Sequence, residues 1–231
     1  MNVDDLRARV AMVRERMEAA RARAGRSDEV TLVAVTKTHP VEVVRAAIEA
    51  GVADVGENRV QEMDEKVAAV GRDAVRWHLI GHLQRNKAAR AVAIADLVHS
   101  LDSVRLAQAL SAEAVKAGVT VRALVQVNTS GEESKFGLPP EEAIDAVGRM
   151  AELPGLRLEG MMTMAPFTGD QAVIRRTFAG ARELRDQAAR QVPAFAGWHL
   201  SMGMSNDFEA AVEEGSTLVR VGSTLFGERG R

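Results

Sequence analysis

Residues Thr31-Leu-Val-Ala-Val-Thr36 form an apolar, β-branched run, and Lys37-Thr-His-Pro40 follows it directly. Such a run predicts a strand of a parallel sheet that is buried on both faces. A lysine at the tip of this strand has two interpretations. Either its stem carries the ammonium out to solvent, or burial lowers its pKa and keeps the amine ready for Schiff-base chemistry. The run alone favours the first interpretation, and the rest of the chain favours the second.

Outward from this run, apolar segments alternate with amphipathic ones. The predicted strands are Thr31–Thr36, Asp54–Gly56, Arg76–Ile80, Leu97–Ser100, Val121–Val127, Leu156–Met161, Trp198–Ser201 and Leu218–Val221. The predicted helices between them include Val41–Ala50, Val60–Val70, Val104–Ala117, Pro140–Ala151 and Ala172–Gln191. Strands that alternate with helices in this way are typical of parallel βαβ units.

Two architectures accommodate such units: a closed (β/α)8 barrel and an open doubly wound sheet. The length of 231 residues and the number of strands favour the barrel. No glycine-rich dinucleotide fingerprint follows the first strand, which counts against a Rossmann sheet. Residues 3–24 add an amphipathic helix ahead of the first strand. We therefore expect an α/β fold, a (β/α)8 TIM barrel with an extra N-terminal helix, as a single domain over residues 1–231.

Composition narrows the class of protein. The formal net charge is −2, so nothing favours binding to nucleic acid or to an anionic membrane. The chain contains no cysteine, which excludes disulfides, thiolate metal sites and cysteine nucleophiles. The charged N-terminus has no apolar core typical of a secretory signal, and no apolar run approaches membrane-spanning length. We expect a cytoplasmic protein with no metal site.

Polar or glycine-bearing stretches follow the predicted strands. They comprise Lys37 and residues 56–62, 81–87, 128–137, 162–164, 201–207 and 222–224. In a (β/α)8 barrel, the loops that follow the strands gather at the C-terminal end and build the functional site. The sequence therefore predicts that the chemistry of this protein lies at that end.

The loops after the last two strands predict a phosphate site. Barrels often hold a phosphate there, at the N-terminus of a short helix. Ser201-Met-Gly-Met-Ser205 precedes a helix expected to begin near Asp207, and Gly222-Ser-Thr224 follows the last strand. Glycine allows the backbone to approach an anion, and free helix N–H groups can bind it. Ordinary turns also carry glycine and serine, but the two loops together favour the phosphate.

Arg220 lies inside the last predicted strand and should point into the barrel. Such an arginine either pairs with a barrel carboxylate or faces a ligand, and the sequence favours neither. A Schiff-base lysine opposite a phosphate site is what pyridoxal 5′-phosphate (PLP) requires. An arginine beside the pyridine nitrogen cannot accept a proton, so it would keep the ring neutral and limit carbanion chemistry.

Several motifs together carry a family resemblance. They are Val33-Ala-Val-Thr-Lys-Thr38, Val55-Gly-Glu-Asn-Arg-Val-Gln-Glu62, Trp77-His-Leu-Ile-Gly-His-Leu-Gln-Arg-Asn-Lys87, Glu133-Ser-Lys-Phe-Gly137, Leu200-Ser-Met-Gly-Met-Ser-Asn-Asp207 and Val219-Arg-Val-Gly-Ser-Thr-Leu-Phe-Gly227. Over nearly its full length the chain resembles the pyridoxal phosphate homeostasis family (YggS/PROSC). This resemblance implies a barrel similar to the N-terminal domain of bacterial alanine racemase.

The resemblance also implies a set of cofactor-binding residues. Lys37 would form the Schiff base, Arg220 would lie near the pyridine nitrogen, Asn58 beside the ring and Met164 near the imine. Phosphate contacts would come from Ser205, Gly222 and Ser223. The loop after the seventh strand adds Ser201, Gly203 and Met204 as candidate cofactor-binding residues. The chain departs from the family in two places: Arg59 stands where tyrosine is frequent, and Ser223 where threonine is frequent. The first departure leaves the contact around Asn58 less defined.

Two functions remain open. A racemase needs a second acid/base opposite the lysine, which in alanine racemase is a tyrosine, and this chain has no tyrosine. His78, His82 and His199 are the candidate substitutes. The resemblance implies instead a non-catalytic carrier that buffers PLP in vitamin B6 homeostasis and delivers it to apo-enzymes. The alternative is an amino-acid racemase or decarboxylase-like enzyme.

Two further expectations concern assembly and cofactor transfer. The missing second domain of alanine racemase would leave no partner interface, which favours a monomer. Lys87 and Lys135 are the spare lysines nearest the mouth of the barrel, and one of them is a candidate transient acceptor of the aldehyde during transfer.

Overall fold

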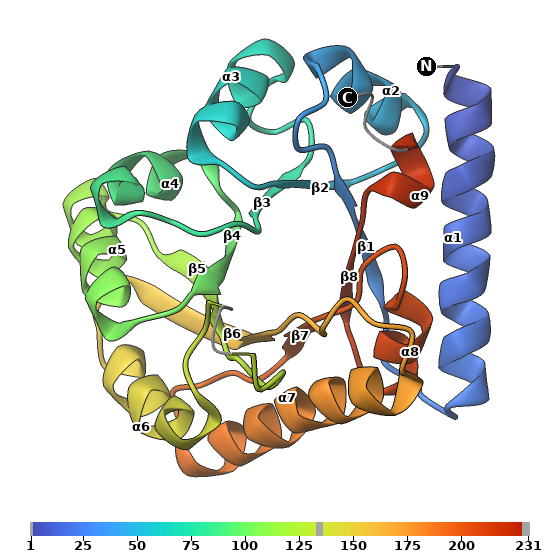
Figure 1. The fold of residues 1–231 in the computed structure, drawn as a ribbon. Coiled ribbons are helices and arrows are strands. Elements are labelled where there is room, and N and C mark those ends of the chain that lie inside the picture. Colours follow the sequence, from blue (N-terminus) through green and yellow to red (C-terminus); the bar gives the residue numbers. More distant parts are fainter. Residues whose placement is uncertain (1, 133–135, 228–231) are drawn as a thin grey trace.

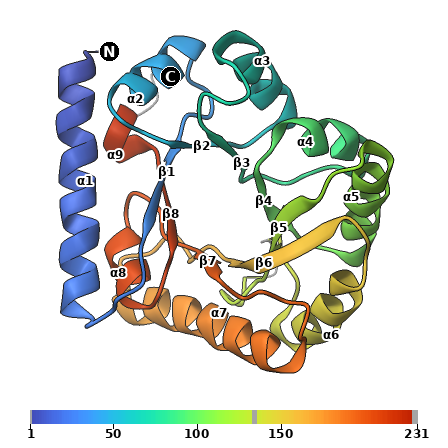
Figure 2. The ribbon, with the colours of Figure 1, turned by 180° about the vertical axis from the view of Figure 1, so that it is seen from behind.

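The computed structural model describes residues 2–132 and 136–227. Eight parallel strands pair in chain order, and the first and the last also pair, so the sheet closes into a barrel (Figures 1 and 2). The strands are β1 (Thr31–Val35), β2 (Asp54–Glu57), β3 (Arg76–Leu79), β4 (Leu97–Leu101), β5 (Val121–Gln126), β6 (Leu156–Met162), β7 (His199–Ser201) and β8 (Leu218–Val221). This arrangement confirms the predicted (β/α)8 TIM barrel.

Helices surround the barrel on its outside (Figure 1). They are α1 (Val3–Arg23), α2 (Val41–Glu49), α3 (Val60–Val70), α4 (Ala88–Ile94), α5 (Val104–Ala117), α6 (Pro140–Ala151), α7 (Gln171–Gln191), α8 (Phe208–Glu213) and α9 (Ser223–Phe226), with a 3-10 turn η1 (Arg85–Lys87) before α4. The sequence did not predict α4 or α9. Neither has an N-cap side-chain hydrogen bond, so neither carries the usual start signal.

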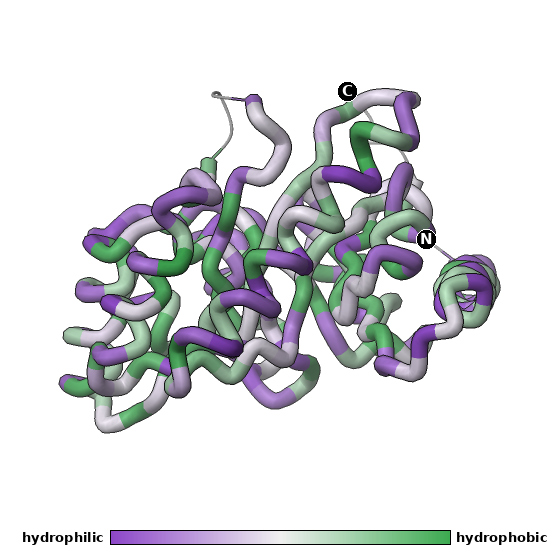
Figure 3. The backbone as a smooth tube through the Cα atoms, turned by 90° about the horizontal axis from the view of Figure 1, so that it is seen from below, coloured by the Kyte–Doolittle hydropathy of each residue, from purple (hydrophilic) through white to green (hydrophobic). Residues whose placement is uncertain are grey.

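The N-terminal helix α1 packs along the outside of the barrel against α2, α8 and α9 (Figure 1). Figure 3 shows this helix end-on at the edge of the molecule, near the N-terminus. Its buried residues recur at helical spacing and are Leu6, Val10, Val13, Met17 and Ala20. Burial of each of the larger side chains contributes about 1.5–3 kcal/mol. Ion pairs at the rim, including Arg16–Glu209 at 2.6 Å, fix the helix against α8. The predicted extra helix is therefore an integral part of the fold.

Alternation along the strands separates two apolar regions. A small cluster fills the barrel interior and consists of Val33, Leu97, Leu124, Met162 and Leu218. A much larger cluster lies between the barrel and the helices, and it includes Val219 and Val221. Because successive strand residues face opposite sides, Arg220 shares the inner face with Leu218, as the sequence predicted. No helix among the described residues is long and apolar enough to cross a membrane.

Candidate functional site

A cavity of about 550 Å³ opens among the loops that follow the strands. Its size suits a small organic ligand. Eight of the ten predicted binding residues line it, namely Lys37, Asn58, Met164, Met204, Ser205, Arg220, Gly222 and Ser223. Five further residues line it that are not among those ten: Val35, His39, Ile80, Asn206 and Gly227. The fold therefore brings residues from distant parts of the sequence to one place.

Lys37 lies in a tight turn immediately after β1 and is half-buried. The next residue, Thr38, has a φ of 66°, in the left-handed region that non-glycine residues rarely occupy. Only surrounding interactions can hold such a conformation, since it costs about 1–3 kcal/mol. On one side of Lys37 the carbonyl oxygen of Thr36 accepts hydrogen bonds, and on the other side the amide of Thr38 donates to Glu62.

A second lysine organises these interactions. The ammonium of Lys66 in α3 is buried and donates to Thr36 O at 2.8 Å, Glu57 Oε1 at 2.7 Å and Glu62 Oε1 at 2.9 Å. The Thr36 hydroxyl also donates to Glu57 Oε1, at 2.5 Å. We call Thr36, Glu57, Glu62 and Lys66 the Lys66 cluster. It fastens the peptide groups on both sides of Lys37, so the position of this turn depends on a buried ion pair.

Glu57 is incompletely paired within the Lys66 cluster. Burial raises the pKa of its carboxyl, and the hydrogen bonds from Lys66 and Thr36 only partly oppose that effect. Its Oε2 atom is buried and has no hydrogen-bond partner among the described residues. A carboxylate that is paired on one side only depends strongly on its partner cation.

The Ser205 hydroxyl lies between the two glycine-bearing loops. Its oxygen accepts hydrogen bonds from the amides of Gly222 at 3.4 Å and Thr224 at 3.3 Å. Both lone pairs of the oxygen are then used, so the hydroxyl hydrogen is left to donate to another group. Asp207 accepts the Met204 amide at 2.5 Å and so holds the first of these loops. The arrangement offers a donor beside the amides of a helix start, as an anion requires.

Close backbone approaches explain two glycines near the cavity. A Cβ on Gly81 would lie 2.2 Å from the carbonyl oxygen of Asn58, so only glycine lets Asn58 reach its place in the wall. Gly203 has a φ of 92°, and its Cβ would lie 2.6 Å from Ala211 Cβ. Gly203 therefore packs the β7–α8 loop onto α8, and it does not line the cavity.

Arg220 is buried, and two hydrogen bonds hold its guanidinium. Nη1 donates to Ser201 Oγ at 2.6 Å, and Nη2 donates to Thr163 O at 3.0 Å. Burial lowers its pKa to about 10, an effect that Asp207 partly opposes. The group is therefore still a cation and an obligate donor near neutral pH. The sequence left two interpretations for Arg220, and the structure places it at the cavity, where no carboxylate of the described residues is hydrogen-bonded to it.

The three histidines considered as acid/base groups lie elsewhere. His78 is buried in the barrel, His82 pairs with Asp102 and stacks on Phe136, and His199 lies beside Thr217. The cavity is lined instead by His39, whose ring contacts Phe226.

Three other predicted residues also lie outside the cavity wall or outside the described chain. Ser201 does not line the cavity but bonds to Arg220. Lys87 lies on the rim, where it lines a separate hollow with Arg59 and His82. Lys135 falls outside the described residues.

Acidic pH is expected to destabilise the protein through His99, which is fully buried on β4. Burial, with His78 and Arg220 nearby, holds its pKa well below 6.5. Just below pH 6.5, His99 therefore binds a proton in the unfolded chain but not in the folded one. The contribution of His99 to the free energy of unfolding is therefore fully present above pH 6.5. It falls as the pH drops below that value, by at most about 1.4 kcal/mol per pH unit.

Burial lowers the pKa of His199 as well, so its effect has the same sign. Urea denaturation of the wild type and of His99→Asn at pH 7.5, 6.0 and 5.0 measures the contribution of His99. We expect a steeper loss in the wild type. Equal pH dependence in the two proteins would contradict the assignment.

Comparisons with known proteins place the chain in a family. Residues 9–230 match the model of the alanine racemase N-terminal domain. A pyridoxal phosphate homeostasis protein of Aquifex aeolicus (strain VF5) is 41% identical over 96% of this chain and 97% of its own length. The human protein of the same name is 40% identical over 94% of this chain and 84% of its own length.

Solved structures agree with this placement. PipY of Synechococcus elongatus PCC7942, solved with PLP bound, superposes with a TM-score of 0.85 at 35% identity, over 96% of this chain and all of PipY. An alanine racemase of Clostridium difficile 630 has a TM-score of 0.80 at 17% identity, and this chain covers 58% of it, so that likeness shows the fold alone. The chain belongs to the pyridoxal phosphate homeostasis protein family, and its barrel is of the alanine racemase N-terminal-domain type.

Proposed function

We propose that this protein binds PLP as a Schiff base on Lys37 and acts in intracellular vitamin B6 homeostasis, buffering or delivering the cofactor without catalytic turnover of its own. The observation that carries the proposal is the single cavity shared by Lys37, Ser205 and Arg220. When bound, PLP supplies an aldehyde that condenses reversibly with an amine, so the same site can store and release it.

The residues present fit such a ligand. The Ser205 hydroxyl hydrogen is left to donate beside the start of α9, and such a donor suits a phosphate group. The Arg220 guanidinium can donate to a ring nitrogen but cannot protonate it readily, because its pKa of about 10 keeps its own proton bound. Asn58 and Met164 line the walls where the ring would lie. The relative solved with PLP bound supports the same ligand for this chain.

Turnover of amino acids distinguishes the carrier hypothesis from the racemase hypothesis. A second base would have to face the lysine, and His39 is the histidine that lines the cavity among the described residues. Its ring lies against Phe226, 5.5 Å between centroids, which favours a wall residue. Incubation of the PLP-loaded protein with single-enantiomer amino acids is expected to give no racemisation or decarboxylation at an enzymatic rate. Sustained turnover of any one of them would establish the enzyme instead.

Replacing Ser205 with alanine is expected to weaken binding of PLP at least about ten-fold, since a hydrogen bond to a charged group contributes about 1.5–3 kcal/mol. Binding of pyridoxal, which lacks the phosphate, should not change. Absorbance titrations with the two aldehydes measure both affinities. Ser27→Ala, an exposed serine before β1, is the control. Equal losses for PLP and pyridoxal would place the phosphate elsewhere.

The remaining parts of the proposal concern assembly, cellular location and partners. We infer one PLP-binding unit, monomeric and cytoplasmic, whose partners are apo forms of PLP-dependent enzymes. Transfer to a defined apo-enzyme, compared with release on dilution alone, tests delivery. Lys87→Ala tests the role of that lysine in transfer, and an unchanged transfer rate would exclude it.

A further inference from the structure

A row of buried polar side chains crosses the barrel interior from Arg220. It runs from β8 through β7, β4 and β3 to β2, and its members are Arg220, Ser201, His99, His78 and Asp54. The links measure 2.6 Å from Arg220 Nη1 to Ser201 Oγ, 2.8 Å from Ser201 Oγ to His99 Nδ1, 2.9 Å from His99 Nε2 to His78 Nδ1 and 2.9 Å from His78 Nε2 to Asp54 Oδ1. No member is more than 4% exposed.

Buried polar side chains are unexpected in the interior of this barrel. Other inward side chains of the same strands, such as Leu97 and Leu218, are apolar and pack together. A buried hydroxyl or imidazole costs free energy unless its polar atoms are paired. Here both ring nitrogens of His78 and of His99 have a partner. The members of the row therefore depend on one another for their hydrogen bonds, and the loss of one member leaves polar atoms of its neighbours without that partner.

The two ends of the row fix the direction of its first and last hydrogen bonds. Arg220 can only donate, and an ionised Asp54 can only accept. Burial opposes ionisation of Asp54, but hydrogen bonds from His78 and Arg76 outweigh it and lower the pKa of that carboxyl. His78 Nε2–H therefore donates to Asp54. With two uncharged imidazole rings, each link carries one hydrogen in one way only: Ser201 donates to Nδ1 of His99, and His99 Nε2–H donates to Nδ1 of His78.

We propose that Asp54, His78, His99 and Ser201 are positioning residues that hold Arg220 in one orientation in the candidate cavity. In this proposal the Ser201 hydroxyl accepts from Arg220 and donates to Nδ1 of an uncharged His99. His99 in turn donates Nε2–H to Nδ1 of an uncharged His78, whose Nε2–H donates to Asp54. The guanidinium is then fixed by two bonds, to Ser201 Oγ and to Thr163 O.

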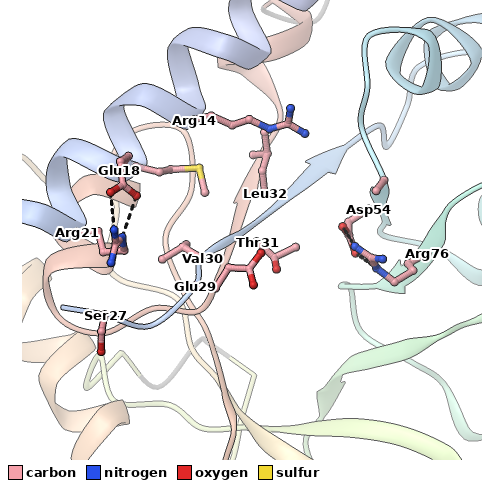
Figure 4. Close-up of a pocket in the computed structure, with 12 residues that line it drawn as sticks. Arg14, Glu18, Arg21, Ser27, Glu29, Val30, Thr31, Leu32, Asp54 and Arg76 are labelled. Atoms are coloured by element: carbon pink, nitrogen blue, oxygen red, sulfur yellow. Dashed lines mark hydrogen bonds and ion pairs between the residues drawn. The ribbon is translucent and has the colours of Figure 1, made fainter.

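The row joins the two ends of the barrel. Asp54 lies at the N-terminal end, where Arg76 pairs with both of its carboxylate oxygens at 2.5–2.6 Å, beside a second cavity of about 670 Å³ (Figure 4). A substitution of Asp54 at the N-terminal end should therefore alter the environment of Arg220 at the C-terminal end. The role of the row in ligand binding rests on the proposed function, in which Arg220 faces the ring nitrogen of PLP.

The hydrogen-bond direction is tested on the protein before PLP is added. Long-range ¹H–¹⁵N NMR of the imidazole rings at pH 7.5 distinguishes the two neutral tautomers and the imidazolium. We expect both His78 and His99 to carry their hydrogen on Nε2. A hydrogen on Nδ1 of His99, or an imidazolium at His78, would overturn the proposal. This readout is independent of PLP, so a wild type that shows the expected tautomers but binds no PLP refutes the proposed function alone.

Transmission along the row is tested with variants at both ends. Asp54→Ala and Ser201→Ala are each expected to shift the ring ¹⁵N signals of His99, move the absorption band of bound PLP and weaken PLP binding about five-fold, the effect of one net hydrogen bond. Ser201→Thr keeps the hydroxyl and should restore all three. Glu29→Ala, in the same N-terminal cavity but outside the row, should change none. Unchanged His99 signals and PLP affinity in Ser201→Ala would overturn the proposal, even if Asp54→Ala fails to fold.

Discussion

Replacing Lys37 with alanine is expected to abolish covalent attachment of PLP while the protein stays folded. Lys37 is the lysine that lines the candidate cavity among the described residues, and its side chain is half-buried at the surface of that cavity. No other lysine in the described part of the chain lines this cavity to take its place in the Schiff base. The wild type should gain a visible absorption band with PLP and a borohydride-stable adduct on the peptide that contains Lys37. The variant should show neither.

The matched control is Lys87→Ala, which removes a lysine from the rim of the barrel and outside the cavity. It should retain the band and the adduct. Peptide mapping by mass spectrometry after borohydride treatment identifies the modified lysine directly. An adduct of equal yield on another lysine in Lys37→Ala would refute the site. Weak, colourless binding of PLP in that variant is expected, because the Ser205 hydroxyl that we propose as a phosphate donor remains.

The barrel could be predicted because its signals are local and repeated. Short strand patterns alternate with helical ones, most of the strands are followed by a polar or glycine-bearing stretch, and a parallel barrel gathers those stretches at one end. The missed helix Ala88–Ile94 has the opposite character. It is short, alanine-rich and uncapped, so its helical state depends on packing against its neighbours α3 and α5.

A site residue could be predicted from the sequence where the strand that carries or precedes it determines its position. Arg220 faces inward by alternation, and Lys37 follows the strand that the sequence marks most clearly. Ser201 is a different case, because the loop pattern pointed to it while its side chain turns to Arg220. His99 could have been found, since it shares a strand face with the inward Leu97.

Lys66 could not have been found from the sequence. A lysine four residues after Glu62 on a helix normally indicates an exposed ion pair. Here the same spacing serves a buried one, because α3 packs its lysine against the ends of β1 and β2. Only the tertiary structure brings the ammonium within 2.8 Å of the Thr36 carbonyl oxygen.

Replacing Lys66 with methionine is expected to cost about 3–5 kcal/mol of stability at neutral pH, because removal of one partner leaves a buried charge unpaired. Methionine matches the length of the lysine stem, so the loss reports the ammonium and not a cavity. The variant should also bind PLP more weakly, since the Thr36 carbonyl oxygen loses the donor that holds the turn of Lys37. Urea denaturation and absorbance titration measure the two effects.

The pH dependence of this loss identifies its cause. Burial already raises the pKa of Glu57 in the wild type, and without Lys66 it should rise further. A folded-state pKa above the unfolded value gives stability that is present at low pH and lost as the pH rises through it. Lys66→Met should therefore be least destabilising near pH 5 and most destabilising near pH 8. Adding Glu57→Gln should recover part of the loss at pH 8, because the uncompensated charge is then absent. If the double variant is as unstable at pH 8 as the two single losses added together, the charges of Glu57 and Lys66 are not coupled, and the Lys66 cluster does not hold the turn of Lys37 as an ion pair.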